Sequence, residues 1–222
     1  MKTIVPAALL AGLLFGCASP VPFRAAAPVA VDDADPVAVA ERFGRAVPDD
    51  FHLLSSIVFE YNWFSVSGIG YLDVDTTAGR YKVVCMNYLG VKILEFEGDR
   101  NGLTHKYMIE PLARQGDIAS VVAEDIKRIY LDLVPSLDAR VVKRRQAILF
   151  RQRSGDGALE YEFSGEGLPL TSKTYREDHR AVWRVSYYEH RSRNGRLYPM
   201  GIVLSNYRNG YRLIVRQKEI RE

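Results

Sequence analysis

Several features that would point to a class of protein are scarce in this 222-residue sequence. Its two cysteines exclude a disulfide-rich scaffold, and its four histidines show neither His-x-x-x-His nor Cys-x-x-Cys spacing, so no metal site is indicated. No apolar run approaches the roughly 18 residues that a membrane-spanning helix needs. The formal net charge of +3 is too small to indicate a protein that binds nucleic acid.

The sequence also lacks the short motifs of common enzymes. It has no Gly-x-Ser-x-Gly nucleophile turn, no phosphate-binding loop and no Gly-x-Gly-x-x-Gly after a strand. Asp178 and His179 are neighbours on an expected strand, where their side chains would point to opposite faces and could not form half of a triad. We therefore expect no enzymatic activity and no cofactor.

Aromatic and aliphatic residues are plentiful. Hydrophobic residues make up 47% of the chain, and 13 Tyr, 9 Phe and 2 Trp supply enough core material for a stable fold without a disulfide or metal. Cys85 lies within an apolar run and is interpreted as a small buried hydrophobe. The composition describes one folded domain.

The N-terminus carries the most specific signal. Lys2 precedes an apolar stretch over 4–15, which is too short to span a bilayer but suits a secretory signal. The stretch ends in Leu-Phe-Gly-Cys, which resembles the bacterial lipobox. That resemblance implies cleavage after Gly16 and acylation of Cys17, whose thiol is the good nucleophile nearby. Lipoproteins that stay in the inner membrane commonly carry Asp after the acylated cysteine. This chain has Ala18 there, so the resemblance favours transport to the outer membrane. The alternative is an ordinary secretory signal that contains a cysteine.

The mature chain divides into a tether and one domain. Residues 17–34 are rich in Ala and Pro and are expected to be a flexible tether that starts at the acylated cysteine. Asp35 and Pro36 then predict a helix start, and Pro48 a helix end. Residues 35–222 show no repeat or composition break and form a single predicted domain.

Within this domain, short runs of period two indicate an antiparallel meander of about ten or eleven strands. A helix with an apolar stripe interrupts them over 117–133, with Asp117 as its N-cap and Pro135 beyond its end. The expected strands cover 57–63, 69–71, 81–85, 91–96 and 103–109 before this helix, and 141–152, 158–164, 170–177, 181–190, 197–206 and 211–219 after it.

Charge is uneven along the chain. Residues 1–139 hold 12 basic and 18 acidic side chains, whereas residues 140–222 hold 18 basic and 9 acidic ones. The basic half is interpreted either as solvated strand faces with protected edges or as a surface for anionic head groups or an acidic partner.

Two stretches resemble the LolA/LolB group of lipoprotein carriers and receptors, and in particular its LolB-like outer-membrane lipoproteins. The first is Val-Cys-Met-Asn-Tyr-Leu-Gly-Val-Lys-Ile-Leu-Glu-Phe over 84–96, a strand, an apolar turn and a strand upstream of the helix. The second is Tyr-Pro-Met-Gly-Ile-Val-Leu-Ser-Asn over 198–206, followed by the closing strand from Gly210. The resemblance covers nearly all of the mature chain.

The resemblance implies an α+β fold, an incomplete antiparallel β-barrel with a helical lid over an apolar cavity that takes an acyl lipid or a lipoprotein from a periplasmic carrier protein. It also implies a membrane-touching loop, for which Tyr88 and Leu89 are candidates. No nucleic acid or metal is expected. The candidate lining residues are Phe59, Tyr61, Trp63, Tyr81, Val83, Ile126, Ile129, Trp183, Val185, Tyr187, Ile202, Leu204, Leu213 and Val215.

Two alternatives stay open at this point. A solid barrel, with the same residues filling its core, would suit a structural or assembly subunit of an envelope complex that docks a partner. A polar residue with a base in reach inside a cavity would instead suit an acyl-processing enzyme.

Overall fold

The computed structural model describes residues 21–114 and 117–221, which form twelve strands and three helices. In chain order these are α1 (Pro36–Ala46), β1 (Asp50–Tyr61), β2 (Phe64–Asp75), β3 (Arg80–Met86), β4 (Lys92–Gly98), β5 (Leu103–Met108), α2 (Glu110–Ala113), α3 (Ile118–Tyr130), β6 (Arg140–Arg144), β7 (Ala147–Ser154), β8 (Gly157–Ser164), β9 (Leu170–Glu177), β10 (Arg180–Arg193), β11 (Arg196–Asn206) and β12 (Tyr211–Arg221).

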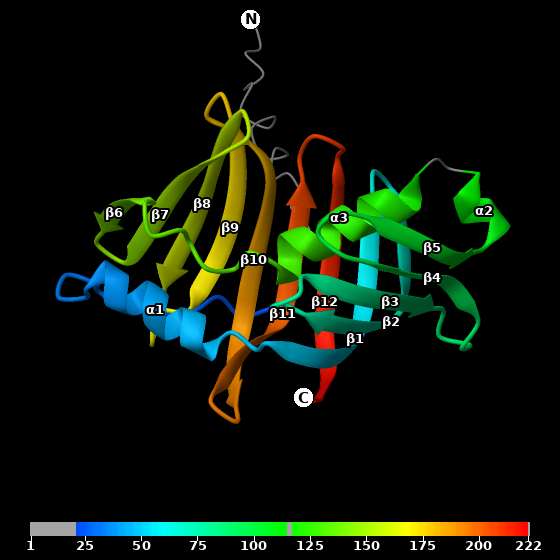
Figure 1. Cartoon of the computed structure of the whole chain (residues 1–222), viewed down its shortest axis with the longest axis horizontal. Helices are drawn as coiled ribbons and strands as arrows, with labels where there is room; N and C mark the ends of the chain where they lie inside the picture. The colour runs from blue at the N-terminus through cyan, green and yellow to red at the C-terminus, as the bar shows by residue number, and fades with distance from the viewer. Residues whose placement is uncertain (1–20, 115–116, 222) are drawn as a thin grey trace, which may run out of the picture.

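All twelve strands belong to one open antiparallel sheet. Their order is β5-β4-β3-β2-β1-β12-β11-β10-β9-β8-β7-β6, so the first and last strands of the chain pair at the centre and complete the sheet. The two edge strands, β5 and β6, are consecutive in the chain. The segment between them must therefore cross the sheet from one edge to the other, and α3 lies on this crossing. Figure 1 shows the sheet curving around α3.

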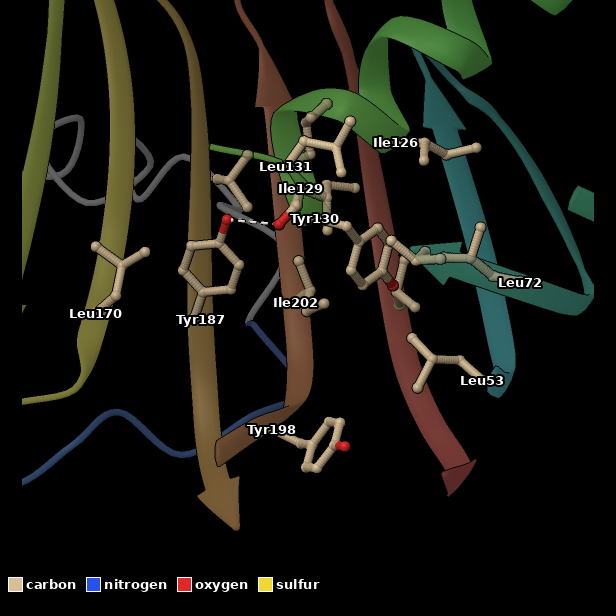
Figure 2. Packing of buried hydrophobic residues seen from close by; sticks show 14 of the residues in the cluster. Leu53, Leu72, Ile126, Ile129, Tyr130, Leu131, Leu170, Tyr187, Tyr198 and Ile202 are labelled. Atoms are coloured by element: carbon tan, nitrogen blue, oxygen red, sulfur yellow. Dashed lines mark hydrogen bonds between the residues drawn. The ribbon is translucent and has the colours of Figure 1, made fainter. Parts of the chain in front are cut away.

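The core lies between α3 and the concave face of the sheet. Ile126 and Ile129 of α3 are buried in one cluster with Tyr187 on β10 and Ile202 on β11 (Figure 2). Phe96 on β4 belongs to the same cluster. Burial of each such side chain contributes about 1.5–3 kcal/mol, so the helix and both halves of the sheet stabilise each other. Among the described residues, no helix is long and apolar enough to cross a membrane.

Both helix starts that the sequence predicts are confirmed. The Asp35 carboxylate accepts a hydrogen bond from the Val37 amide at 3.1 Å, and the Asp117 carboxylate accepts one from the Ser120 amide at 3.1 Å. The second helix is shorter than predicted. It ends at Tyr130 because the next residue takes an extended backbone, φ −105° and ψ 159°.

The strand prediction is correct in type, but two hairpin turns were missed. The sequence predicts one strand through residue 63, whereas β1 ends at Tyr61 and Asn62 turns the chain with φ 53°, a conformation that asparagine tolerates. Likewise, the predicted strand 141–152 is two strands, β6 and β7, joined by a turn after Arg144. Both turns lack a Gly-containing dipeptide, so they left no strong signal in the sequence.

The described part of the segment before α1 lies against the sheet. Phe23 is buried on the convex face, where it stacks on Tyr188 with ring centroids 5.5 Å apart and packs against Val203 and Ile214. Val31 is buried in the main core, and its amide donates to a β6–β7 turn carbonyl. The sequence predicts a flexible tether as far as residue 34, whereas packing begins by Phe23.

We expect a Gly201→Val substitution to release this segment. Gly201 lies directly beneath the Phe23 ring, and a Cβ at this position would collide with the ring carbons. Hydrogen exchange of amides 23–31 should accelerate while exchange in the central strands stays slow. Gly102→Ala is the matched control, because nothing lies within 4 Å of a Cβ there. Unchanged exchange in the Gly201 variant would show that Phe23 does not occupy this site in solution.

Candidate functional site

The concave face brings together most of the residues that the sequence analysis assigns to a lipid site. They come from both halves of the sheet and from α3, and all belong to the buried cluster of the main core. These residues are Tyr81, Val83, Ile126, Ile129, Trp183, Val185, Tyr187, Ile202, Leu204 and Val215.

The remaining candidates lie toward one end of this face or outside it. Phe59 and Leu213 are partly buried against the core, and Tyr61 is 46% exposed. Trp63 lies on the β1–β2 turn and is 96% exposed, so its assignment to the lining of the interior was wrong. Its position follows from the missed turn, because a residue in a turn does not share the face of the strand before it.

A wide, open pocket of about 620 Å³ is lined by residues of β1–β5, among them Asp75, Arg80 and Tyr81. The space between α1, α3 and the sheet is instead nearly filled, and it holds a cavity of about 40 Å³ with Phe43, Ile129 and Tyr187 in its wall. Such a volume holds a few water molecules but no acyl chain. Two polar side chains also reach it, Gln217 and His190, and burial lowers the pKa of His190 to about 4. The apolar side of α3 covers this part of the concave face.

The carboxyl end of α3 is held by donors from the sheet. Helix ends leave carbonyls without partners and carry partial negative charge. The Tyr187 hydroxyl donates to the carbonyl of Ile129 at 2.8 Å (Figure 2), and the Lys173 ammonium donates to the carbonyl of Leu131 at 2.7 Å. The Tyr161 hydroxyl donates to the carbonyl of Asp132 at 3.0 Å. We call these three bonds the α3 latch.

The lysine of the α3 latch is unusual because it lies inside the core. Lys173 is 3% exposed, and this burial lowers the pKa of its amine to about 8. Burial likewise raises the pKa of the Tyr161 and Tyr187 hydroxyls above their ordinary range. The tyrosines therefore remain neutral donors, and the lysine carries a charge that the interior accommodates at a cost.

A second polar contact fixes the middle of α3. The Asp125 carboxylate, 4% exposed, accepts hydrogen bonds from the Tyr211 hydroxyl at 2.7 Å and from the Arg128 guanidinium at 2.8 Å. The Asn206 amide donates to the same hydroxyl at 3.0 Å, and the Arg128 guanidinium lies 5.6 Å from the ring centre of Trp183. Burial raises the pKa of Asp125.

The sequence analysis missed these polar contacts, although one of them left a signal. Asp125 follows Ile118 by seven residues and precedes Ile129 by four, so it falls within the apolar stripe of α3. A carboxylate in such a stripe indicates a buried partner. Lys173 and Asn206 gave no comparable signal, because polar residues on strands usually face solvent.

No catalytic or metal-binding cluster accompanies the site in the described residues. No group of three or more His, Cys, Asp or Glu there could hold a metal ion. Cys85 packs against the core, and burial raises the pKa of its thiol to about 12, which makes it a poor nucleophile. Asp178 and His179 form the β9–β10 turn with φ of 46° and 65°, rather than lying on a strand. Glu160 pairs with Arg151 and with Arg176.

The two candidates for a membrane-touching loop form the β3–β4 turn. Tyr88 is 60% exposed and Leu89 is 88% exposed, and neither packs into the core cluster. The acylation candidate Cys17 and the cleavage candidate Gly16 lie outside the described residues.

Comparison with known proteins identifies the architecture through structure rather than sequence. Neither a protein-family model nor a curated protein sequence matches the chain. A LolA superfamily protein of Nitrosomonas europaea superposes with a TM-score of 0.54 at 8% identity, covering 83% of this chain and 92% of its own. A domain of Vibrio parahaemolyticus assigned to outer membrane lipoprotein sorting superposes with a TM-score of 0.54 at 9% identity, covering 83% and 91%. The open antiparallel sheet around α3 is therefore similar in fold to these two proteins.

Proposed function

We propose that this protein is an outer-membrane lipoprotein that binds or transfers an acylated ligand, an acyl lipid or a lipoprotein, on the concave face of its sheet. The ligand enters when α3 leaves this face, so α3 acts as a lid. Acyl binding needs no catalytic group, and the proposed role is non-catalytic. Anchoring through Cys17 faces the domain toward the periplasm, where a soluble carrier protein is the proposed donor of the ligand.

The observation that supports this proposal is the polar character of the contact between α3 and the sheet. A permanent core element would gain more stability from apolar packing than from a buried lysine and a buried aspartate. Lys173 on the sheet instead donates to the Leu131 carbonyl at the end of α3. Asp125 on α3 accepts a hydrogen bond from Tyr211 on the sheet. When α3 moves away, water solvates both groups, so the helix can be displaced at a lower cost than an apolar helix could.

An acyl chain can compete with the helix for this face because both are stabilised by apolar burial. Each CH₂ moved from water into an apolar site gains about 0.8 kcal/mol, or roughly 12 kcal/mol for a 16-carbon chain. Displacing α3 costs the burial of its apolar side chains, among them Ile126 and Ile129, and the three latch bonds at about 1 kcal/mol each. The face that α3 covers includes Val185, Ile202 and Val215, which are apolar and buried.

The filled interior favours a second candidate function, that of an assembly subunit whose partner docks at the sheet edge. β6 is an edge strand with all five of its residues exposed, among them Arg140, Lys143 and Arg144. An acidic extended segment would pair with this edge through backbone hydrogen bonds and through charge. A protein that takes up no acyl ligand but binds such a segment, and loses it on Arg144→Glu, would favour this function over the first.

Weakening the α3 latch should increase acyl binding. Tyr187→Phe keeps the ring and removes the bond to Ile129, so we expect the Kd for a fluorescent fatty acid to fall about fivefold. Tyr188→Phe is the matched control, because that side chain lies on the convex face against Phe23 and should leave the Kd unchanged. Equal Kd values for the Tyr187 variant and the unmodified protein would contradict the role of α3.

Native mass spectrometry of the mature protein, combined with lipid extraction, identifies the chemical class of the ligand. We expect co-purified acyl lipid, and its loss when Leu213, at the edge of the concave face, is changed to lysine. A folded Leu213→Lys protein that keeps the lipid would place the ligand elsewhere. A mature protein free of lipid that also fails to bind the fluorescent fatty acid would refute the carrier function.

The buried lysine predicts a pH dependence of stability. Below pH 8 the Lys173 amine is protonated in both the folded and the unfolded chain. Between pH 8 and 10.5 the unfolded chain binds more protons than the folded chain. The contribution of Lys173 to the free energy of unfolding therefore rises with pH by about 3 kcal/mol. Urea unfolding should show this rise in the unmodified protein relative to Lys173→Met. The control is Lys218→Met, an exposed site that should show no such difference. A constant difference across this range would contradict a buried, charged Lys173.

A further inference from the structure

The wide pocket at one end of β1–β5 has an acidic wall. Its volume of about 620 Å³ lies within the range of small-molecule sites. Five carboxylates line it against two cationic side chains, which gives the wall a formal charge of −3. The carboxylates are those of Asp50, Asp73, Asp75, Glu97 and Asp99. A pocket of this charge attracts cations and repels anions.

Two of these carboxylates oppose each other. Asp50 and Asp75 are directly opposite in the register of β1 and β2, where like charges are destabilising. The Arg80 guanidinium donates to the Asp75 carboxylate at 2.8 Å and also attracts Asp50, so one cation serves both. Hydrogen bonds from the Ala78 amide and from Arg80 lower the pKa of Asp75, which therefore stays ionised. A further cation at this position would relieve the repulsion.

The carboxylates are spread along the pocket rather than gathered at one point. Asp50, Asp75 and Glu97 lie on β1, β2 and β4. Neighbouring strands are about 4.8 Å apart, so this row extends over roughly 14 Å. Within the described residues, no three groups of this kind are close enough to hold a metal ion. A linear cation that carries several charges therefore fits the row better than a single metal ion.

A buried hydroxyl lies at the wall of the same pocket. Tyr81 is 3% exposed, and its hydroxyl has no hydrogen-bond partner in the described part of the chain. The hydroxyl lies over Gly98, where a Cβ would be 2.7 Å from the hydroxyl oxygen and 2.8 Å from the Gly102 carbonyl oxygen. Two oxygens thus converge at one point of the wall. A buried polar group without a partner is costly, so this one indicates a ligand that supplies the missing bond.

An ammonium group matches the chemistry of this point. It has three N–H donors and no acceptor, whereas a hydroxyl and a carbonyl can both accept. Burial raises the pKa of Tyr81, so its hydroxyl stays neutral. Hydrogen bonds from the amides of Asn101 and Gly102 lower the pKa of Asp99, so a charged acceptor lies in the same turn.

We propose that this pocket binds a linear polyamine, an alkyl chain with two or more ammonium groups. One ammonium binds at the Tyr81 hydroxyl, and another binds between Asp50 and Asp75. The methylene chain lies against Val74 and Leu103, which are the apolar residues of the wall. No residue of this wall belongs to the α3 latch, so the inference does not rest on the proposed function.

Isothermal titration calorimetry of the protein with spermidine at low salt tests this site. We expect Asp50→Asn to raise the Kd about fivefold, because it removes one charge of the pocket. The matched control is Glu166→Gln, which removes an exposed carboxylate from the loop between β8 and β9 and should leave the Kd unchanged. Magnesium chloride titrated in the same way should bind more weakly than spermidine.

A Tyr81→Phe variant separates a ligand role of the hydroxyl from a structural role. Because the hydroxyl has no partner in the protein, its removal should leave the thermal midpoint of the ligand-free protein unchanged or raise it. The Kd for spermidine should instead rise about tenfold, since the ammonium loses an acceptor. Tyr207→Phe, at a ring that is 56% exposed, should change neither quantity.

Four results would overturn the proposal. One is the absence of spermidine binding at low salt. Another is an equal Kd for magnesium, which would show only general attraction of counterions. A third is a Kd for spermidine that neither Asp50→Asn nor Tyr81→Phe changes. The fourth is tighter binding of a trilysine peptide, which would assign the pocket to a protein partner. Binding of the fluorescent fatty acid should be unchanged in Asp50→Asn, so failure of this site is distinguishable from failure of the carrier function.

Discussion

The connection between the two edges of the sheet is the constraint on which the rest of this structure depends. Because β5 and β6 are consecutive in the chain and lie at opposite edges, the segment between them must cross the sheet. An amphipathic helix is well suited to this crossing, since it satisfies its own backbone and buries one apolar stripe. The carbonyls at its end still need donors, and Lys173, Tyr187 and Tyr161 on the sheet supply them. The curvature of the sheet, the core beneath α3 and the polar contacts at its end thus all follow from the connection between β5 and β6.

The same crossing links the fold to the proposed function. In the proposed function, α3 covers the apolar face on which an acyl chain would bind and has to leave it first. A cavity of about 40 Å³ remains between α1, α3 and the sheet, too small for an acyl chain while α3 is in place. The buried polar groups of Lys173 and Asp125 position the helix, and they stabilise it less than apolar side chains of similar size would.

Much of the local structure could be predicted from neighbouring residues. The period-two runs predicted an antiparallel meander, and Asp35 and Asp117 marked both long helices correctly, because capping and alternation depend on neighbouring residues alone. The resemblance to LolA/LolB proteins predicted the open antiparallel sheet, and the two loop candidates Tyr88 and Leu89 are exposed in the structure. Most of the predicted lining residues do face the concave side, since alternation fixes which face of a strand is apolar.

The partners of each face depend on contacts between residues that are far apart in the chain. No local pattern showed that the turn after Tyr61 would place Trp63 in solvent, or that Phe23 would pack on the convex face. The partner of Lys173 lies 42 residues away, on the far side of the crossing, and therefore depends on the order of the strands. Whether the half-barrel was hollow or filled also stayed open in the sequence, because a cavity wall and a packed core use the same residues. In this structure α3 nearly fills the space beneath it, where a cavity of about 40 Å³ remains.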